Sequence, residues 1–168
     1  RARPKRFGER PAGAPVIALA IGTQFPDLVD KPLAWYLGVL PSGRSLAHSV
    51  FVAVFLIALI YWIVRRYDRR ELGVAFALGY LSHLLGDVAY PLFGGEWKAL
   101  GILLWPIVPQ PGSETDYTIL EVLLQTTESA TGIFEIVLFF LTTGLWIAHR
   151  GPGLWLCLRT IRSVVPRG

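Results

Sequence analysis

The sequence predicts an all-α protein, a polytopic bundle of about four transmembrane helices with one re-entrant or interfacial segment. Of its 168 residues, 53% are hydrophobic and only 17% are charged, whereas soluble domains contain about 25% charged residues. The apolar residues also form long runs that are bounded by charges. This composition excludes a disordered chain and disfavours a soluble domain. The net charge of +4 is modest, so we expect no nucleic-acid partner.

Three of the four spans follow from long apolar runs. Residues 46–64 contain no formal charge, and residues 72–93 contain only Asp87. Both runs are long enough to cross a hydrocarbon core of about 30 Å. Residues 129–148 contain only Glu135 and form the last predicted span.

Two further apolar segments are shorter. Residues 11–29 are predicted to form the first span, although their uncharged part has only 16 residues. Residues 99–109 are too short to cross a bilayer, so we expect a re-entrant or interfacial segment there. In this scheme a single transmembrane domain, residues 11–150, lies between a basic arm, residues 1–10, and a basic tail, residues 151–168.

The basic residues are sorted along the chain. Thirteen of the 16 fall in the N-terminal arm, in the 65–71 loop or after His149, whereas nine of the 12 acidic residues fall elsewhere. The positive-inside rule places those three segments in the cytoplasm. We therefore predict a multi-pass protein of the cell membrane whose N-terminal arm is cytoplasmic and whose partner is the lipid bilayer. The sequence does not fix the oligomeric state.

Three pairs of polar residues fall at the outer ends of the predicted spans: Asp27 with Asp30, Arg44 with His48, and His83 with Asp87. The members of each pair are three or four residues apart, so on a helix they share a face. An ionisable group inside a span costs about 2.5–3.5 kcal/mol and normally faces a partner or a cavity. Three such pairs at one depth predict a single polar site.

Carboxylates and imidazoles in one site indicate a divalent metal, with zinc favoured. Such an ion would neutralise carboxylates that otherwise repel one another in a low dielectric. We assign four residues as metal ligands: Asp27, His48, His83 and Asp87. Asp30 is assigned as a further ligand or a general base, and Arg44 is assigned to orient the substrate.

Each pair alone also has a simpler interpretation. The pair His83 and Asp87 is compatible with a structural hydrogen bond within one helix. Asp27 and Asp30 are compatible with solvated residues at a helix end, and Arg44 with an ion pair or a lipid phosphate contact.

Four segments, in order, resemble a known family: GTQFPDLVD, GRSLAHS, GYLSHLLGDVAYP and LLWPIVP. Together, over roughly residues 15–110, they resemble the membrane-bound metal-dependent hydrolases described as LexA-binding, inner-membrane-associated hydrolases. That family has PD-x-D, R-x-x-x-H-S and G-x-x-x-H-x-x-x-D elements. The aspartate pair is one residue further apart here. The matching residues are Pro26 and Asp27 with Asp30, Arg44 with His48 and Ser49, and Gly79 with His83 and Asp87.

A more distant similarity concerns His83, Asp87 and Pro91, whose spacing is similar to the H-x-x-x-D-x-x-x-P helix of zinc-dependent phospholipase C. The family resemblance also implies a histidine upstream of the first aspartate element. This chain has none before His48 and contains no methionine, so we expect that ligand in a leading segment that is absent here.

The resemblance and the donor set together imply a metal-dependent hydrolase. Metal-activated water would attack a phosphoester or another ester, for which a lipid is the natural substrate, at the outer membrane face. The alternative is a non-enzymatic membrane protein, in which the polar cluster is structural or part of an ion or proton path. The chain has no internal repeat of the kind that transporters often show.

Overall fold

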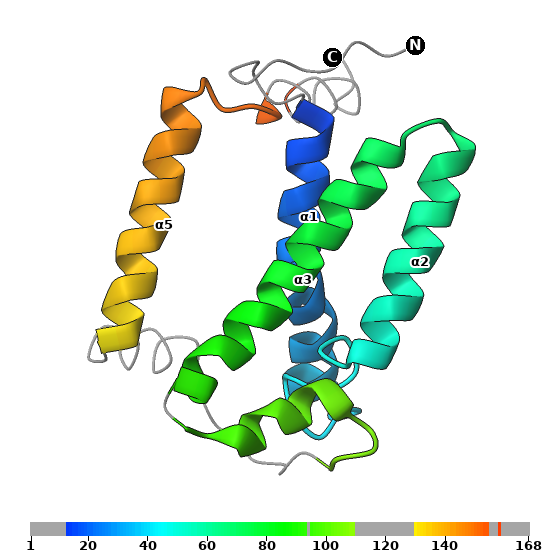
Figure 1. Ribbon diagram of the computed structural model, residues 1–168, viewed down its shortest axis with the longest axis vertical. Helices are drawn as coiled ribbons and strands as arrows, with labels where there is room; N and C mark the ends of the chain where they lie inside the picture. The colour runs from blue at the N-terminus through cyan, green and yellow to red at the C-terminus, as the bar shows by residue number, and fades with distance from the viewer. Residues whose placement is uncertain (1–12, 94, 110–129, 155–157, 159–168) are drawn as a thin grey trace, which may run out of the picture. The chain divides into compact units, whose positions relative to one another are not determined.

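The computed structural model describes residues 13–93, 95–109, 130–154 and 158, which form helices joined by turns and loops. The α-helices among them are α1 (Gly13–Lys31), α2 (Val50–Arg66), α3 (Arg70–Phe93) and α5 (Ala130–Ala148) (Figure 1). A π-helix, η1 (Pro32–Tyr36), extends α1, and a 3-10 helix, η2 (Trp97–Leu104), follows α3. These residues contain no strand, which confirms the all-α prediction.

The four-span prediction is not confirmed. Of the described helices only α3 is long and apolar enough to cross a membrane. α2 has 17 residues, and Gly132–Ala148 within α5 is a shorter apolar helix. α1 has 19 residues, but its last turns contain three charged residues, Asp27, Asp30 and Lys31.

The chain divides into two compact units. One unit, Ile17–Asp116, contains all the polar pairs singled out above. The other comprises Arg1–Val16 and Tyr117–Gly168, and its described helix is α5. No formal charge except that of Glu135 interrupts α5, as is typical of a helix surrounded by apolar groups.

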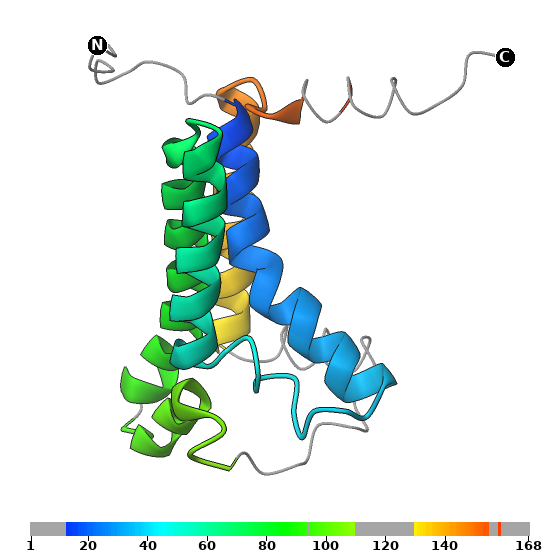
Figure 2. The same ribbon diagram turned by 90° about the vertical axis from the view of Figure 1, so that its right-hand side faces the viewer.

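Helices α2 and α3 form an antiparallel hairpin through a short turn at residues 67–69 (Figures 1 and 2). Their core consists of four buried side chains: Ala53, Phe76, Tyr80 and Leu84. Phe25 of α1 packs edge-on against Phe76, with ring centroids 5.6 Å apart. The core of this unit therefore joins α1 to the hairpin.

Two glycines allow the backbones of α1 and α3 to meet closely. A Cβ atom on Gly22 would collide with the Phe76 carbonyl oxygen, and one on Gly79 with the Leu19 carbonyl oxygen. Small residues at helix crossings permit this kind of approach. α1 then changes direction in its second half (Figure 2), because Pro26 within it has no N–H to donate to the helix.

Candidate metal centre

The loop of residues 37–49 is organised by one carboxylate from α1. Asp30 is fully buried and accepts hydrogen bonds from the backbone N–H groups of Ser45 and Ala47, both at 2.8 Å. The His48 N–H group donates to it at 3.3 Å. Buried N–H groups require partners, and here a side chain supplies them in place of a helical turn.

This arrangement explains where α2 begins. The sequence predicted a span from residue 46, whereas α2 starts at Val50, with Ser49 as its N-cap residue. The N–H groups of the preceding residues bond to Asp30. A carboxylate 15 or more residues upstream therefore sets the helix start, which local apolarity could not reveal.

Asp30 also orients the ring of His48. Its Oδ2 atom lies 2.8 Å from His48 Nδ1, and His48 is fully buried. A carboxylate accepts hydrogen bonds, so we assign the ring proton to Nδ1, which leaves the lone pair of Nε2 facing the opposite way. The Tyr80 hydroxyl donates to the carbonyl oxygen of Ala47 and holds the neighbouring backbone in place.

Three more side chains meet at His48 Nε2. His83 Nε2 lies 3.2 Å away, Asp87 Oδ2 lies 3.2 Å away and Asp27 Oδ1 lies 3.6 Å away. His83 Nε2 is in turn 3.4 Å from Asp87 Oδ2 and 3.8 Å from Asp27 Oδ1. Ligand atoms around a tetrahedral zinc ion with bonds of 2.0–2.1 Å are about 3.3 Å apart, so these spacings suit a metal ion.

Most of the atoms that face this point are acceptors, and His83 Nε2 is the one whose tautomer could make it a donor. Asp87 Oδ2 is buried and accepts no hydrogen bond from the described residues. With the proton of His48 on Nδ1, its Nε2 atom is an acceptor as well. Acceptors this close need a cation or a proton between them, since an unpaired buried polar group is costly. The donor set of imidazoles and carboxylates fits zinc.

Within the cluster, three residues form a group that could hold a metal ion. One ligand atom from each of Asp27, His48 and His83 lies within 4.8 Å of the other two. Two imidazoles and one carboxylate are a ligand set that catalytic zinc sites use, with a further position left open.

Each carboxylate of the cluster has a cationic partner on its outer oxygen. Lys31 Nζ lies 2.7 Å from Asp27 Oδ2, and Arg44 Nη2 lies 3.4 Å from Asp87 Oδ1. Such outer partners fix the orientation of metal ligands. The Arg44 side chain is 50% exposed, so part of its guanidinium group remains accessible.

Comparison with known proteins places the chain in a family. The sequence model of the YdjM inner membrane proteins matches residues 2–159. The chain belongs to the YdjM inner membrane protein family. Searches of curated proteins and of solved structures gave no match. Family membership confirms a membrane protein, but its description names no activity and supports neither a hydrolase nor a likeness to phospholipase C.

In this YdjM-family protein all six predicted site residues gather in one region. Four of them surround a common point: Asp27, His48, His83 and Asp87. The other two do not face this point. Asp30 contacts His48, and Arg44 contacts Asp87. The expected upstream histidine stays a prediction, because the sequence contains no histidine before His48.

Sequence reasoning missed two contributors to the site. Lys31 could have been found, because it lies one helical turn after Asp27 and therefore on the same face. The backbone donors of Ser45 and Ala47 left no signal, since any residue type except proline carries an N–H group.

Proposed function

We propose that this YdjM-family protein is a metal-dependent hydrolase that binds zinc and cleaves a phosphoester at the outer membrane face. The observation that carries the proposal is the convergence of Asp27, His83 and Asp87 on His48 Nε2, where Asp87 Oδ2 is buried and accepts no hydrogen bond from the described residues. A divalent cation held by Asp27, His48 and His83 would lower the pKa of a bound water and supply a nucleophile near neutral pH.

Asp87 is assigned here as the general base. The sequence analysis counted it among the ligands, whereas in this proposal the ion is held by Asp27, His48 and His83, each of which can offer one ligand atom. Its Oδ2 atom faces the cluster and accepts no hydrogen bond from the described residues, so it is free to take a proton from an attacking water. Arg44 holds its other oxygen, which fixes the carboxylate in this orientation.

Asp30 is assigned as a positioning residue. Both of its oxygens already accept hydrogen bonds, from the backbone and from His48 Nδ1. A carboxylate with these partners and no exposed surface is poorly placed to exchange protons with a substrate. Its role in the proposal is to hold the ring of His48 and keep the proton on Nδ1.

Arg44 is assigned to the substrate. Its exposed guanidinium group can donate to the anionic oxygens of a phosphoester and stabilise the charge that develops on them. Because the family is one of membrane proteins, a phospholipid is the first substrate to test.

The test begins with the metal content of the full chain, purified in detergent and measured by elemental mass spectrometry. We expect about one zinc per chain. We also expect hydrolysis of bis(p-nitrophenyl) phosphate or of phospholipid vesicles that is lost on chelation and restored by zinc. A protein without bound metal would contradict the proposal. A protein that binds zinc but hydrolyses none of these substrates would support the structural alternative.

Two conservative variants separate the ligand role from the base role. Asp27→Asn should lose zinc, whereas Asp87→Asn should keep zinc and lose about 10²–10⁴-fold in hydrolysis rate. Equal loss of zinc in both variants would show that Asp87 is a ligand. His149→Ala, which removes the one histidine outside the site, is the matched control and should change neither property.

A further inference from the structure

The opposite end of the α2–α3 hairpin carries a group of arginines that the proposed function does not use. Residues 65–70 contain four of them: Arg65, Arg66, Arg69 and Arg70. Asp68 lies in the turn and Glu71 in the first turn of α3, yet within the described part of the chain none of the four guanidinium groups forms an ion pair. This end of the hairpin therefore presents positive charge that no carboxylate of the described residues neutralises.

Two of these arginines line a cavity. An open cavity of about 290 Å³ is bounded by Trp62, Arg65 and Arg66. The Arg66 guanidinium carbon lies 4.0 Å from the centre of the Trp62 ring, a cation–π contact that holds the group in place while the N–H groups at its edge remain available. The site is thus partly organised before any ligand arrives.

An apolar strip on α2 leads up to this cavity. Phe55, Leu59 and Trp62 are 65%, 38% and 52% exposed. Their spacing, four and then three residues, places them on one face of the helix, and Arg66 follows four residues later on the same face. The strip places a cation at the end of an exposed apolar surface. This arrangement is complementary to a phospholipid, which has an anionic phosphate at the end of apolar acyl chains.

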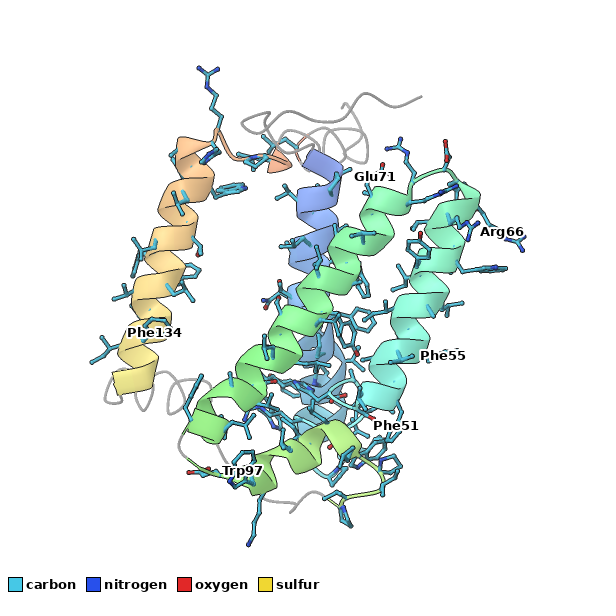
Figure 3. All side chains as sticks on the ribbon, in the orientation of Figure 1. Phe51, Phe55, Arg66, Glu71, Trp97 and Phe134 are labelled. Carbon is cyan, nitrogen blue, oxygen red and sulfur yellow. The ribbon has the colours of Figure 1, made fainter. Side chains whose placement is uncertain are left out.

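The location of the cavity also fits a lipid. α3, which is long enough to cross a membrane, begins at Arg70, so the turn lies where a span would meet the headgroup layer. Figure 3 shows Arg66 and Glu71 at this end of the hairpin, with Phe51 and Trp97 toward the other end. Asp87 lies 17 residues further along α3 than Arg70, about 26 Å away, which separates the cavity from the candidate metal centre.

We propose that Trp62, Arg65 and Arg66 bind the headgroup phosphate of an anionic phospholipid, whose acyl chain lies along Leu59 and Phe55. Guanidinium groups bind phosphate oxygens in a paired geometry. Tryptophan is favoured at headgroup depth, and basic pockets at the ends of spans recognise acidic lipids. This proposal does not depend on hydrolysis at the metal centre.

The test is native mass spectrometry of the detergent-purified chain, titrated with phosphatidylglycerol or with phosphatidylcholine of the same acyl chains. Phosphatidylglycerol should bind more tightly. The double variant Arg65→Gln/Arg66→Gln should weaken this binding by about 5- to 30-fold. Trp62→Ala should also weaken it, and Trp62→Phe should retain most of it, because a ring is kept beneath Arg66.

The matched control removes the same charge from the same turn. Arg69→Gln/Arg70→Gln should weaken binding by less than about threefold, because these residues do not line the cavity. Equal weakening by both double variants would overturn the proposal in favour of diffuse attraction to the whole turn. Equal binding of the two lipids would also overturn it. Competition by inorganic phosphate as effective as that by phosphatidylglycerol would identify a free-anion site and reject the lipid.

Discussion

The two ends of the α2–α3 hairpin handle charge in opposite ways. At the candidate metal centre, among the described residues, two of the three carboxylates pair with Lys31 and Arg44, and Asp87 Oδ2 remains a buried acceptor without a hydrogen bond. At residues 65–70 the four guanidinium groups are exposed and form no ion pair with the described residues. In the two proposals, a small cation completes the first end and the headgroup of an anionic phospholipid binds at the second.

The largest expected effect is at the metal centre. His83→Ala removes one of the three proposed ligands, and we expect zinc affinity to fall by at least about 10³-fold. Isothermal titration of the apo-protein measures this directly. Lipid binding at the Trp62 cavity should not change. If His83→Ala keeps the zinc affinity of the unaltered protein, the His83 imidazole is not a ligand. The proposed difference between the metal end and the arginine end of the hairpin would then lose its main support.

The next effect tests the residue behind the ligands. Asp30→Asn should reduce zinc affinity by about 10- to 100-fold without removing any ligand atom. The carboxylate of Asp30 accepts hydrogen bonds on two oxygens, whereas the amide of asparagine has only one oxygen. Its NH₂ group would face the N–H groups that now donate to Asp30. Asp68→Asn, a change of the same type in the arginine turn, is the control and should leave zinc affinity unchanged. Equal affinities in Asp30→Asn and the unaltered protein would refute the positioning role.

A packing change should affect only one of the two ends. Gly79→Ala places a Cβ atom against the backbone of α1, and we expect a loss of about 1–3 kcal/mol in stability together with weaker zinc binding. Gly86→Ala, on the same helix, meets open space and should be neutral or stabilising by up to about 1 kcal/mol. Thermal unfolding in detergent compares the two. Similar stabilities would show that α1 does not pack closely against α3.

The smallest expected effect concerns the outer partner of Asp27. Lys31 is partly exposed, and exposed ion pairs contribute about 0.2–1 kcal/mol. Lys31→Met should therefore weaken zinc binding by less than about fivefold, and the difference should shrink further at high salt. If Lys31→Met loses as much zinc affinity as Asp30→Asn, the ion pair of Lys31 with Asp27 is as important for zinc binding as the buried contact between Asp30 and His48.

Much of the candidate site could be predicted because the relevant signal is local. Asp27, His48, His83 and Asp87 stand out as ionisable groups within or beside apolar runs, where their placement is costly unless they meet partners. Their separate roles were not predictable. Asp27 and Asp30 differ by only about 60° around a helix, so spacing alone cannot tell which carboxylate faces the histidines and which supports the loop.

The sequence by itself determined the helical class, the membrane character and the identity of the polar residues, because apolarity and charge act on each segment independently of its neighbours. The tertiary structure decided what those residues contact. Asp30 reaches backbone N–H groups 15 to 18 residues away and shortens α2, and Arg44 meets a carboxylate on another helix. Such contacts depend on where Pro26 bends α1 and where Gly22 and Gly79 let the helices meet, since both set the distances between distant parts of the chain.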